Sequence, residues 1–485
     1  MNEMPTLPPE WLIPAEDWEG TPASVRVVVL AMYQQVQQLQ AEVAELKEQL
    51  NRNSRNSSQP PSSDGPAQQS PKAEGNAPEK KRRRGGQPGH PGHRRDLVAV
   101  EEVDRVEVCK PTQCVGCGSA LEGDDPAPYR YQTVELPPVK PYTTEYQVHT
   151  VTCPCCGTVN RGELPREAAA SMFGPNLTGL IAILMGVFRL SKRKVVALLD
   201  MCYGIRLSPG SVVRVQMSTS TALAEPVEQA RAAVQTHAAR YIDETGWRQG
   251  DQERKGWLWV VVTPLVSVFV IVLSRASQVA QDLLDPESSG AAITDRAGCY
   301  TWLKGRVWQV CWAHLLRDFQ KILERGGESY AVGENLRLQG EYLLVLWSRV
   351  RDGTLSHADF LADLPAIQEA VRHWLTEGAA CAHPKTAETC RRILAVDAAL
   401  WTFATHPEVE PTNNTAERAL RHAVIWRRTS YGTQSEAGSR FVERILTVVA
   451  TCHQQERSPL AFVCQAVRAH RTGQPVPSLL PDTLS

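Results

Sequence analysis

The order of apolar segments in the second half of the chain limits the fold more than any other feature. ARYIDET contains a short apolar run that ends at Asp243, and GWLWVVVTPLVSVFVIVLS is a longer run broken at Thr263-Pro264. β-Branched and aromatic residues dominate both, which favours strands. AAIT, which ends at Asp295, and RVWQVCW are further strand candidates, and helical patterns alternate with them. The predicted order is β-β-β-α-β-α-β-α, which indicates an α/β fold.

Two aspartates, Asp243 and Asp295, follow short strands that are predicted to be buried. A carboxylate at the end of a core strand is held rigidly, and two neighbouring carboxylates repel each other unless cations lie between them. Two Mg²⁺ ions about 4 Å apart can clamp the attacking and leaving oxygens of a phosphodiester. Mn²⁺ suits the same oxygen ligands. We therefore predict a site for two Mg²⁺ (or Mn²⁺) ions.

A third acid is expected in such a site, and Glu417 in PTNNTAERALR is the best candidate. Asn413 or Asn414 would cap a helix there and place Glu417 in its first turn. Taken singly, each of the three acids is more often a surface or capping residue. Four arginines follow and are candidates for phosphate contacts: Arg418, Arg421, Arg427 and Arg428.

The interval between the second and third acids contains a long helical stretch. Residues 320–405 have helical patterns throughout, including LRLQGEYLLVLWSRVRDG. We interpret this stretch as a helical insertion in a catalytic domain that spans 236–455. Residues 456–485 are expected to form a C-terminal tail.

Residues 22–51 carry apolar side chains at alternating steps of four and three, with Gln, Glu and Lys between them. This heptad spacing predicts a parallel two-stranded coiled coil and hence a homodimer or higher oligomer. The alternative is one amphipathic helix packed against its own domain. The seam consists of Val25, Val29, Met32, Val36, Leu39, Val43, Leu46 and Leu50.

Residues 52–96 are predicted to be a disordered linker with a basic arm, because Ser, Pro, Gln, Asn and Gly cannot build a core. The arm KKRRRGGQPGHPGHRR resembles segments that insert arginines into the minor groove. The alternative is a solvated basic linker without a DNA contact. The basic residues of the arm are Lys80, Lys81, Arg82, Arg83, Arg84, Arg94 and Arg95.

Residues 97–165 contain two CxxC pairs, each followed by glycine, with 35 residues between them. Two such pairs can present four thiolates to one tetrahedral Zn²⁺. We predict a zinc ribbon with one structural ion, in which YRYQTVELP and TTEYQVHTV are extended. Cys155 is an alternative ligand, and Cys109 is a further spare thiol. The predicted ligands are Cys114, Cys117, Cys153 and Cys156.

Residues 174–225 are predicted to be helical. Ser191 suits the cap of one helix, a turn is expected at Tyr203-Gly204, and Ser208-Pro209 suits the start of the next helix. This pattern resembles a DNA-binding helix-turn-helix with Arg214 on the exposed face of its second helix. Any small helical bundle would give the same pattern.

The overall composition excludes several classes of protein. The chain has 485 residues, which suggests about three domains, and its formal net charge is −1, which excludes a uniformly basic nucleic-acid coat. No run of 18 apolar residues and no signal peptide is apparent. The 13 cysteines are spread along the chain, which favours reduced thiols in a cytoplasm.

In combination, these segments resemble the transposases of the insertion sequence 66 family, a group of bacterial DDE transposases. The resemblance rests on the N-terminal zipper, NSSQPPSSD, GGQPGHPG, the two CxxCG pairs, DETGW, TDRAGCY, CWAHLLRDF and NNTAERALR. In TDRAGCY the residues after the arginine depart from those that are frequent in relatives, but the aspartate is kept.

The resemblance implies an RNase H-like catalytic domain with Asp243, Asp295 and Glu417 as its acids. It implies cleavage and strand transfer of DNA at the terminal inverted repeats of the element, in the bacterial cytoplasm near the nucleoid. Proteins of the same element are possible partners, and no membrane is involved. Cys311 and His314 match a C-x2-H element that shapes the site, with a purely structural role as the alternative. Two rival hypotheses are a zinc-containing DNA-binding regulator without catalysis and an RNase H-like nuclease.

Overall fold

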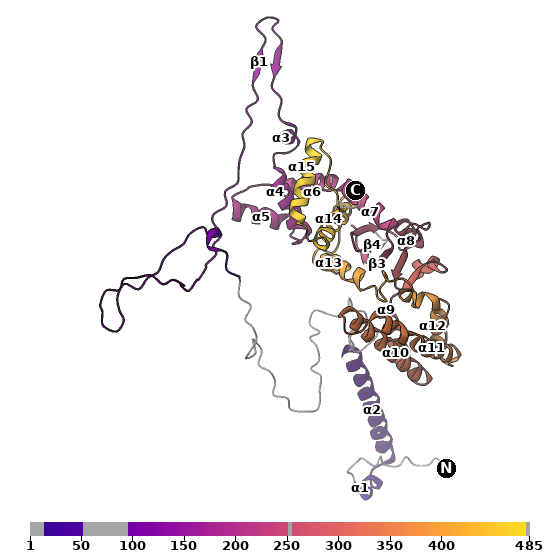
Figure 1. Cartoon of the computed structure of the whole chain (residues 1–485). Helices are drawn as coiled ribbons and strands as arrows, with labels where there is room; N and C mark the ends of the chain where they lie inside the picture. Colours follow the sequence, from indigo (N-terminus) through magenta and orange to yellow (C-terminus); the bar gives the residue numbers. More distant parts are fainter. Residues whose placement is uncertain (1–13, 52–95, 251–254, 482–485) are drawn as a thin grey trace. The chain divides into compact units, whose positions relative to one another are not determined.

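The computed structural model describes residues 14–51, 96–250 and 255–481 (Figure 1). The chain divides into two compact units, one formed by residues 1–68 and 143–485 and the other by residues 69–142. The basic arm lies outside the described residues. Each unit is described by itself below.

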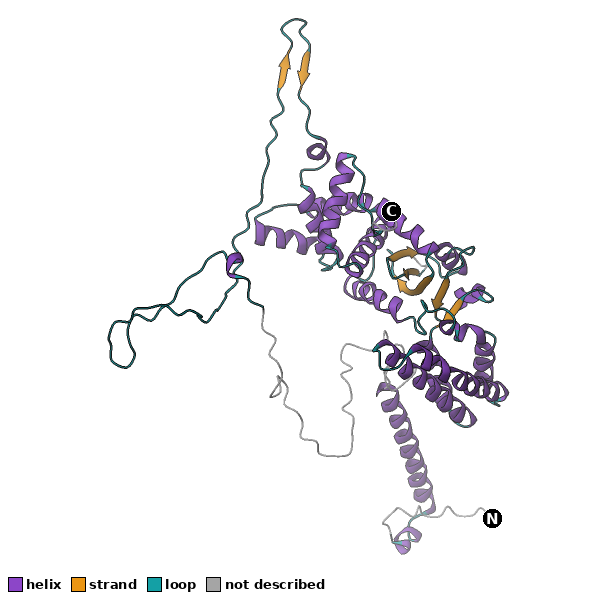
Figure 2. Ribbon diagram, in the orientation of Figure 1, coloured by secondary structure: helices purple, strands orange, loops and turns teal. Residues whose placement is uncertain are grey.

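A five-stranded mixed sheet forms the centre of the larger unit (Figure 2). Its order is β5-β4-β3-β6-β7; β3, β4 and β5 are antiparallel, whereas β6 and β7 run parallel to β3. The α/β prediction is confirmed at this level, and a turn at Thr263-Pro264 separates β4 from β5. The strands are β3 (Ala239–Trp247), β4 (Gly256–Val262), β5 (Ser267–Val272), β6 (Ala291–Thr294) and β7 (Trp308–Val310).

The strands are buried because helices cover the sheet. Trp259 and Ile242 are fully buried within it, as expected for strands rich in apolar residues. α14 packs against β5, α13 packs against β3 and β4, and α7 contacts both β5 and α8. These helices are α7 (Ala224–Thr236), α8 (Ser277–Leu284), α13 (Asn414–Ser430) and α14 (Glu436–Gln454).

Polar side chains of α14 satisfy the outer edge of β5. The hydroxyl of Thr451 accepts a hydrogen bond of 3.1 Å from the backbone of Ser267, and that of Thr447 accepts one of 3.0 Å from Phe269. Glu443, one turn earlier, accepts from Ile271. Four residues of a helix rise by about 6 Å, and two residues of a strand rise by about 6.8 Å. Because the two spacings are similar, every fourth side chain of α14 can bond to every second backbone N–H of β5.

Helices also fill the interval between β7 and α13. α10 packs between α9 and α11, and α12 packs against α11. Leu336, Phe360 and Leu375 lie in the core of this group. Two 3-10 turns, η4 (Asp397–Leu400) and η5 (Thr402–Ala404), follow α12. The helices are α9 (Trp312–Leu323), α10 (Glu328–Arg351), α11 (His357–Ala380) and α12 (Pro384–Leu394).

Ahead of the sheet the chain forms α3 (Arg166–Ala170), α4 (Pro175–Gly186), α5 (Lys192–Tyr203) and α6 (Pro209–Ala222). The hydroxyls of Ser191 and Ser208 accept backbone hydrogen bonds at the starts of α5 and α6. Gly204 ends α5 with a φ of 65°, a conformation that favours glycine.

The segment 456–485, expected as a tail, instead contains a core helix. α15 (Pro459–Thr472) packs against α4 and α6, and its Phe462 and Val463 are buried. The last helix of the sequence therefore supplies one side of the helical region. By length and composition alone, the stretch Arg166–Gly186 could cross a membrane. Here its apolar part is α4, a helix that α15 covers.

The N-terminal residues form α1 (Ala15–Glu19) and a long helix, α2 (Ala23–Asn51). The seam residues Val25, Met32, Leu39 and Leu46 are exposed in the single chain. A continuous helix with an exposed apolar seam is what a coiled coil requires. The coiled coil itself stays a prediction.

Regular structure is sparse between residues 96 and 165. The smaller unit has a 3-10 turn, η2 (Val100–Glu102), and one isolated bridge between Gln113 and Ala120 among its described residues. The expected extended segment 129–137 pairs with no strand. In the larger unit, β1 (Thr150–Thr152) and β2 (Val159–Arg161) form an antiparallel hairpin.

Candidate active site

Asp243 on β3 and Asp295, the residue directly after β6, occupy matching positions along two neighbouring parallel strands. Tyr241 of β3 is paired with Ile293 of β6, and each aspartate follows its paired residue by two positions. Because side chains alternate along a strand, the two carboxylates extend the same face of the ladder. Asp295 comes directly after β6, as predicted.

The prediction that β3 ends at Asp243 is wrong. β3 continues to Trp247, and Asp243 is paired with Val260 of β4. The parallel partner stops beside Asp243, but the antiparallel partner extends further and keeps the next four residues in the sheet. The backbone of Asp243 is therefore paired with β4 on one side, and among the described residues it has no strand partner on the other side, where β6 has ended.

The electrostatic environment of both aspartates favours their protonated forms. Burial, followed by the charges of Glu244, Asp295 and Glu417, raises the pKa of Asp243 well above its usual range. Burial and the charge of Glu244 raise the pKa of Asp295 to about 6, against the opposing effect of the Ala297 N–H. Bound cations would relieve this repulsion, which is the electrostatic condition for a metal site between carboxylates.

Glu417 reaches the same region from α13. It stands in the first turn of that helix, and its N–H donates to the carbonyl of Asn413. Its carboxylate lies 3.3 Å from Nη2 of Arg317 and 3.4 Å from Nδ1 of His314. Its charge is among those that raise the pKa of Asp243. The structure thus brings the three predicted acids into one neighbourhood.

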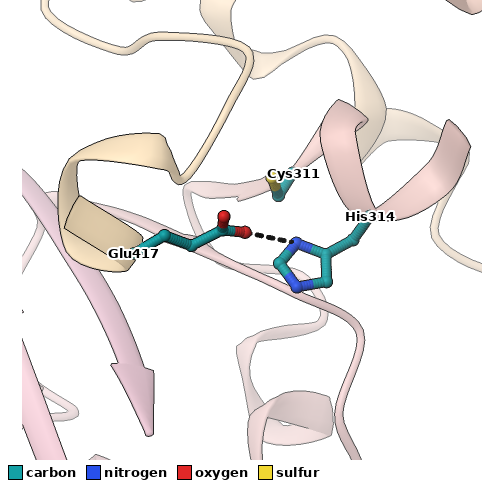
Figure 3. Close-up of side chains that lie close together, drawn as sticks. All are labelled: Cys311, His314 and Glu417. Carbon is teal, nitrogen blue, oxygen red and sulfur yellow. Dashed lines mark ion pairs between the residues drawn. The ribbon is translucent and has the colours of Figure 1, made fainter. Parts of the chain in front are cut away.

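Cys311 and His314 lie beside Glu417 at the start of α9 (Figure 3). The ligand atoms of these three residues all lie within 4.8 Å of one another. Burial raises the pKa of Cys311 to about 12, so its thiol is neutral at pH 7. Burial, reinforced by Arg317, lowers the pKa of His314 to about 3, so its imidazole is neutral as well.

Asn413 ties the site together in a way that the sequence did not indicate. It occupies the N-cap position of α13, but its side chain makes no capping bond. Instead, Nδ2 donates a hydrogen bond of 2.7 Å to the carbonyl of Ile242. Its backbone N–H donates to Sγ of Cys311 over 3.0 Å. One buried residue therefore links β3, the turn before α9 and the helix of Glu417.

A second buried network lies next to Asp243 and was also missed. The side chain of Glu244 is almost fully buried, accepts a hydrogen bond of 2.7 Å from Nε of Arg275, and accepts another from the hydroxyl of Tyr300. Arg275 stacks over Trp257. An acid inside an apolar strand needs such partners, and DETGW contains that signal. Tyr300 follows Asp295 in η3 (Gly298–Leu303), so the network joins the segments of both aspartates.

The predicted DNA-binding arginines of the described chain differ in their surroundings. Arg418 and Arg421 are exposed on α13, and Arg214 is exposed on α6. Arg427 donates to the hydroxyl of Thr245 over 3.0 Å and to the carbonyl of Gly246, so it also supports the end of β3. Arg428 follows it on α13; burial, and then the charge of Arg428, lowers the pKa of Arg427.

The two CxxC turns have matching geometry, although each lies in a different unit. The N–H groups of Cys114 and Cys153 donate to carbonyls five residues later. The following glycines, Gly118 and Gly157, have φ values of 75° and 72°. Sγ of Cys156 lies 3.2 Å from the hydroxyl of Thr158.

This environment favours thiolates, the form that binds metal. Hydrogen bonds from the hydroxyl and then the backbone of Thr158 lower the pKa of Cys156 to about 7. Hydrogen bonds from Ser119 likewise lower the pKa of Cys117. Each turn by itself thus fits half of a four-thiolate zinc site. Cys109 and Cys155 are exposed.

Comparison with known proteins gives two family matches and one curated relative. Residues 170–441 match the family described as "Transposase IS66 family", which covers more than half of the chain. Residues 14–96 match a family of unknown function. An uncharacterized protein, y4qI, from Sinorhizobium fredii (strain NBRC 101917 / NGR234) is 29% identical over 168 residues, 34% of this chain and 31% of the relative. The chain thus spans about a third of the relative's length.

Proposed function

This chain belongs to the IS66 transposase family, and from that premise we propose that it cleaves and joins DNA at the ends of its own insertion sequence. Asp243, Asp295 and Glu417 are the proposed catalytic acids, which hold two Mg²⁺ or Mn²⁺ ions. The matched positions of Asp243 on β3 and of Asp295 directly after β6 support this proposal. Glu417 completes the set from α13, and its charge acts on Asp243.

The sheet supports an RNase H-like assignment for residues 236–455. Three antiparallel strands followed by two parallel ones, with the first strand in the middle, give the order expected for that fold. The acids then lie where β3 and β6 end their parallel pairing. In this proposal residues 320–405, which include α10 to α12, are an insertion between β7 and α13 that leaves this order intact.

The residues present fit hard divalent ions. Oxygen ligands suit Mg²⁺, and the raised pKa values of Asp243 and Asp295 indicate carboxylates that lack enough positive charge around them. When bound, the ions supply a polarised water and stabilise charge on the leaving oxygen. The chain itself holds Asp243 on β3, where it is paired with Val260 of β4, and holds Glu417 on α13. The exposed Arg418 and Arg421 are available to phosphates.

DNA binding is assigned to the parts outside the catalytic domain. The basic arm would contact the backbone or minor groove, and α6 would present Arg214 to a groove in a helix-turn-helix arrangement. The CxxC pairs would hold one structural Zn²⁺, and α2 would pair with a second copy through its exposed seam. The enzyme would act in the bacterial cytoplasm, with accessory proteins of the same element as further partners.

A strand cleavage assay on a labelled inverted-repeat end tests the proposal. Asp243→Asn is expected to abolish Mg²⁺-dependent cleavage while end binding in a mobility-shift assay is kept. Asp363→Asn, which changes an exposed acid on α11, is the matched control and retains cleavage. Normal cleavage by Asp243→Asn overturns the catalytic assignment. Cleavage without joining to target DNA would favour a nuclease, and binding by the wild type without cleavage would favour a regulator.

A further inference from the structure

We propose that Cys311, His314 and Glu417 form a binding site for one borderline-soft divalent ion such as Zn²⁺, next to the two aspartates and sharing Glu417 with them. The ligand atoms already lie within 4.8 Å of one another, in a mutual arrangement that a small side-chain movement would close around an ion (Figure 3). Binding at this site does not depend on the proposed catalytic function.

Local structure brings the sulfur and nitrogen ligands together. Cys311 is the N-cap residue of α9 and His314 lies in its first turn, so the two side chains share one helix end. Cys311 follows β7 directly, and its N–H donates to the carbonyl of Thr294 at the end of β6. The sheet thus fixes the position of the thiol, and the helix fixes the direction of the imidazole.

The surroundings of the sulfur resemble those of a metal-bound thiolate. The backbone N–H of Asn413 donates to Sγ of Cys311 over 3.0 Å. That N–H is itself held in place, because the Asn413 side chain is anchored to the carbonyl of Ile242. Hydrogen bonds from fixed N–H groups to a ligand sulfur orient it and spread its negative charge, which is the usual support for a coordinating thiolate.

The imidazole directs its Nδ1 atom toward the same point. Nδ1 of His314 is buried and has no hydrogen-bond partner among the described residues. It faces the carboxylate of Glu417 at 3.4 Å, on the side where Sγ of Cys311 also lies. A buried polar atom without a partner is unfavourable, and a metal ion placed between Nδ1 and the carboxylate would supply the missing partner.

The mixed ligand set determines which ions the site would take. A thiolate, an imidazole and one carboxylate suit Zn²⁺ and similar ions with a fourth position left for water, whereas Mg²⁺ avoids sulfur. On binding, the S–H bond of Cys311 breaks, the S–metal bond forms and the proton leaves to solvent. Arg317 lies 3.3 Å from Glu417 and opposes a cation, and the thiolate and carboxylate together outweigh its single charge.

Sharing of Glu417 gives the site a regulatory consequence that rests on the proposed function. A carboxylate engaged with Cys311 and His314 is less available to hard ions held by Asp243 and Asp295. Zn²⁺ is therefore expected to inhibit Mg²⁺-dependent strand cleavage, and Cys311→Ser is expected to weaken that inhibition by tenfold or more. A failure of Zn²⁺ to inhibit cleavage would overturn this regulatory consequence, but it would not overturn the proposed binding site itself.

Cobalt binding to the full chain tests the site directly. After removal of metals with a chelator, the wild type is expected to bind one more Co²⁺ per chain than Cys311→Ser. The difference spectrum should show sulfur-to-cobalt charge transfer. His314→Gln should lose the same equivalent, whereas Cys452→Ser, which changes a buried thiol on α14, should retain it. Co²⁺ bound at the predicted four-thiolate site is the same in all these proteins, so it does not affect the difference between them.

The remaining outcomes separate the hypotheses. Equal Co²⁺ binding and equal spectra in the wild type, Cys311→Ser and His314→Gln overturn the site. If circular dichroism shows that Cys311→Ser does not fold, His314→Gln decides, because it keeps the helix end and the buried thiol. Asp243→Asn should bind the extra Co²⁺ normally. Cleavage by Asp243→Asn would overturn the catalytic assignment, but it would not change the Co²⁺ binding result.

Discussion

Nδ2 of Asn413 donates a hydrogen bond of 2.7 Å to the backbone carbonyl of Ile242, the residue before Asp243. The bond spans 171 positions in the sequence and is fully buried. It connects the start of the helix that carries Glu417 to the strand that carries the first aspartate. One amide thus links the segments of two proposed catalytic acids, in addition to the packing of α13 on β3.

Asn413→Ala should therefore reduce both stability and cleavage. The carbonyl of Ile242 would lose its side-chain donor, which costs about 1–3 kcal/mol of unfolding free energy in a buried position. Strand cleavage should fall further than stability alone explains, because the start of α13, which carries Glu417, loses its direct bond to the residue before Asp243. Urea unfolding and a cleavage assay measure the two effects. Asn414→Ala, one position along and exposed, is the control and should change neither.

Tyr300→Phe should destabilise the fold through Glu244. It removes the hydroxyl donor from an almost fully buried carboxylate and leaves only Arg275 to satisfy the charge. We expect a loss of about 1–3 kcal/mol in urea unfolding. Tyr330→Phe removes an exposed hydroxyl that contacts Glu334 on α10, and should cost less than about 0.5 kcal/mol. Equal effects of the two substitutions would contradict the role given to Glu244.

Stability should depend on pH through Asp295. Its pKa in the folded chain is raised from 3.8 to about 6, so between these values the folded state keeps a proton that the unfolded state has lost. Unfolding free energy from this group therefore falls as pH rises through that window. Asp295→Asn lacks the effect and should gain in thermal stability relative to the wild type between pH 4 and pH 7, without divalent ions.

The same two proteins test whether cations relieve the repulsion. At pH 7.5, Mg²⁺ should raise the unfolding midpoint of the wild type more than that of Asp295→Asn. Asp363→Asn on α11 serves as the reference for removal of one exposed negative charge. A stability difference between wild type and Asp295→Asn that does not change with pH would show that Asp295 titrates normally.

The glycine after the first CxxC pair should control zinc affinity. Gly118 has a φ of 75°, a conformation that costs an alanine about 1–2 kcal/mol. If the cysteines hold zinc, Gly118→Ala should weaken binding about tenfold in competition with a chromophoric chelator. At Gly116 an added Cβ would meet only Sγ of Cys114 at 3.9 Å, so Gly116→Ala is the control. Similar losses for both variants would argue against the turn geometry.

Local patterns in the sequence predicted what depends on near neighbours. Ser191 and Ser208 cap their helices because the capping bond reaches only three residues ahead. The aspartate after AAIT was identified because a short apolar run stops there. In each case the feature depends only on residues within a few positions of one another, so the local sequence is sufficient to predict it.

Long-range relationships were not predictable in this way. β3 continues past Asp243 because β4 pairs with it there. No residue in ETGW indicates that a second strand will pair with this segment. The bond from Asn413 to Ile242 and the contact of Tyr300 with Glu244 depend on how distant segments meet. α15 looks like an ordinary amphipathic end, and only the apolar face of α4 explains why it is a core helix.

The threonines of α14 have a consequence for incomplete copies of this protein. Thr447 and Thr451 occupy the N–H groups along the outer edge of β5. A chain that stops before Glu436 would keep all three proposed acids but leave that edge unpaired. Open edges recruit strands from other molecules. A prematurely terminated copy is therefore expected to aggregate and be degraded. It would not remain available to enter assemblies of the intact enzyme as an inhibitory subunit.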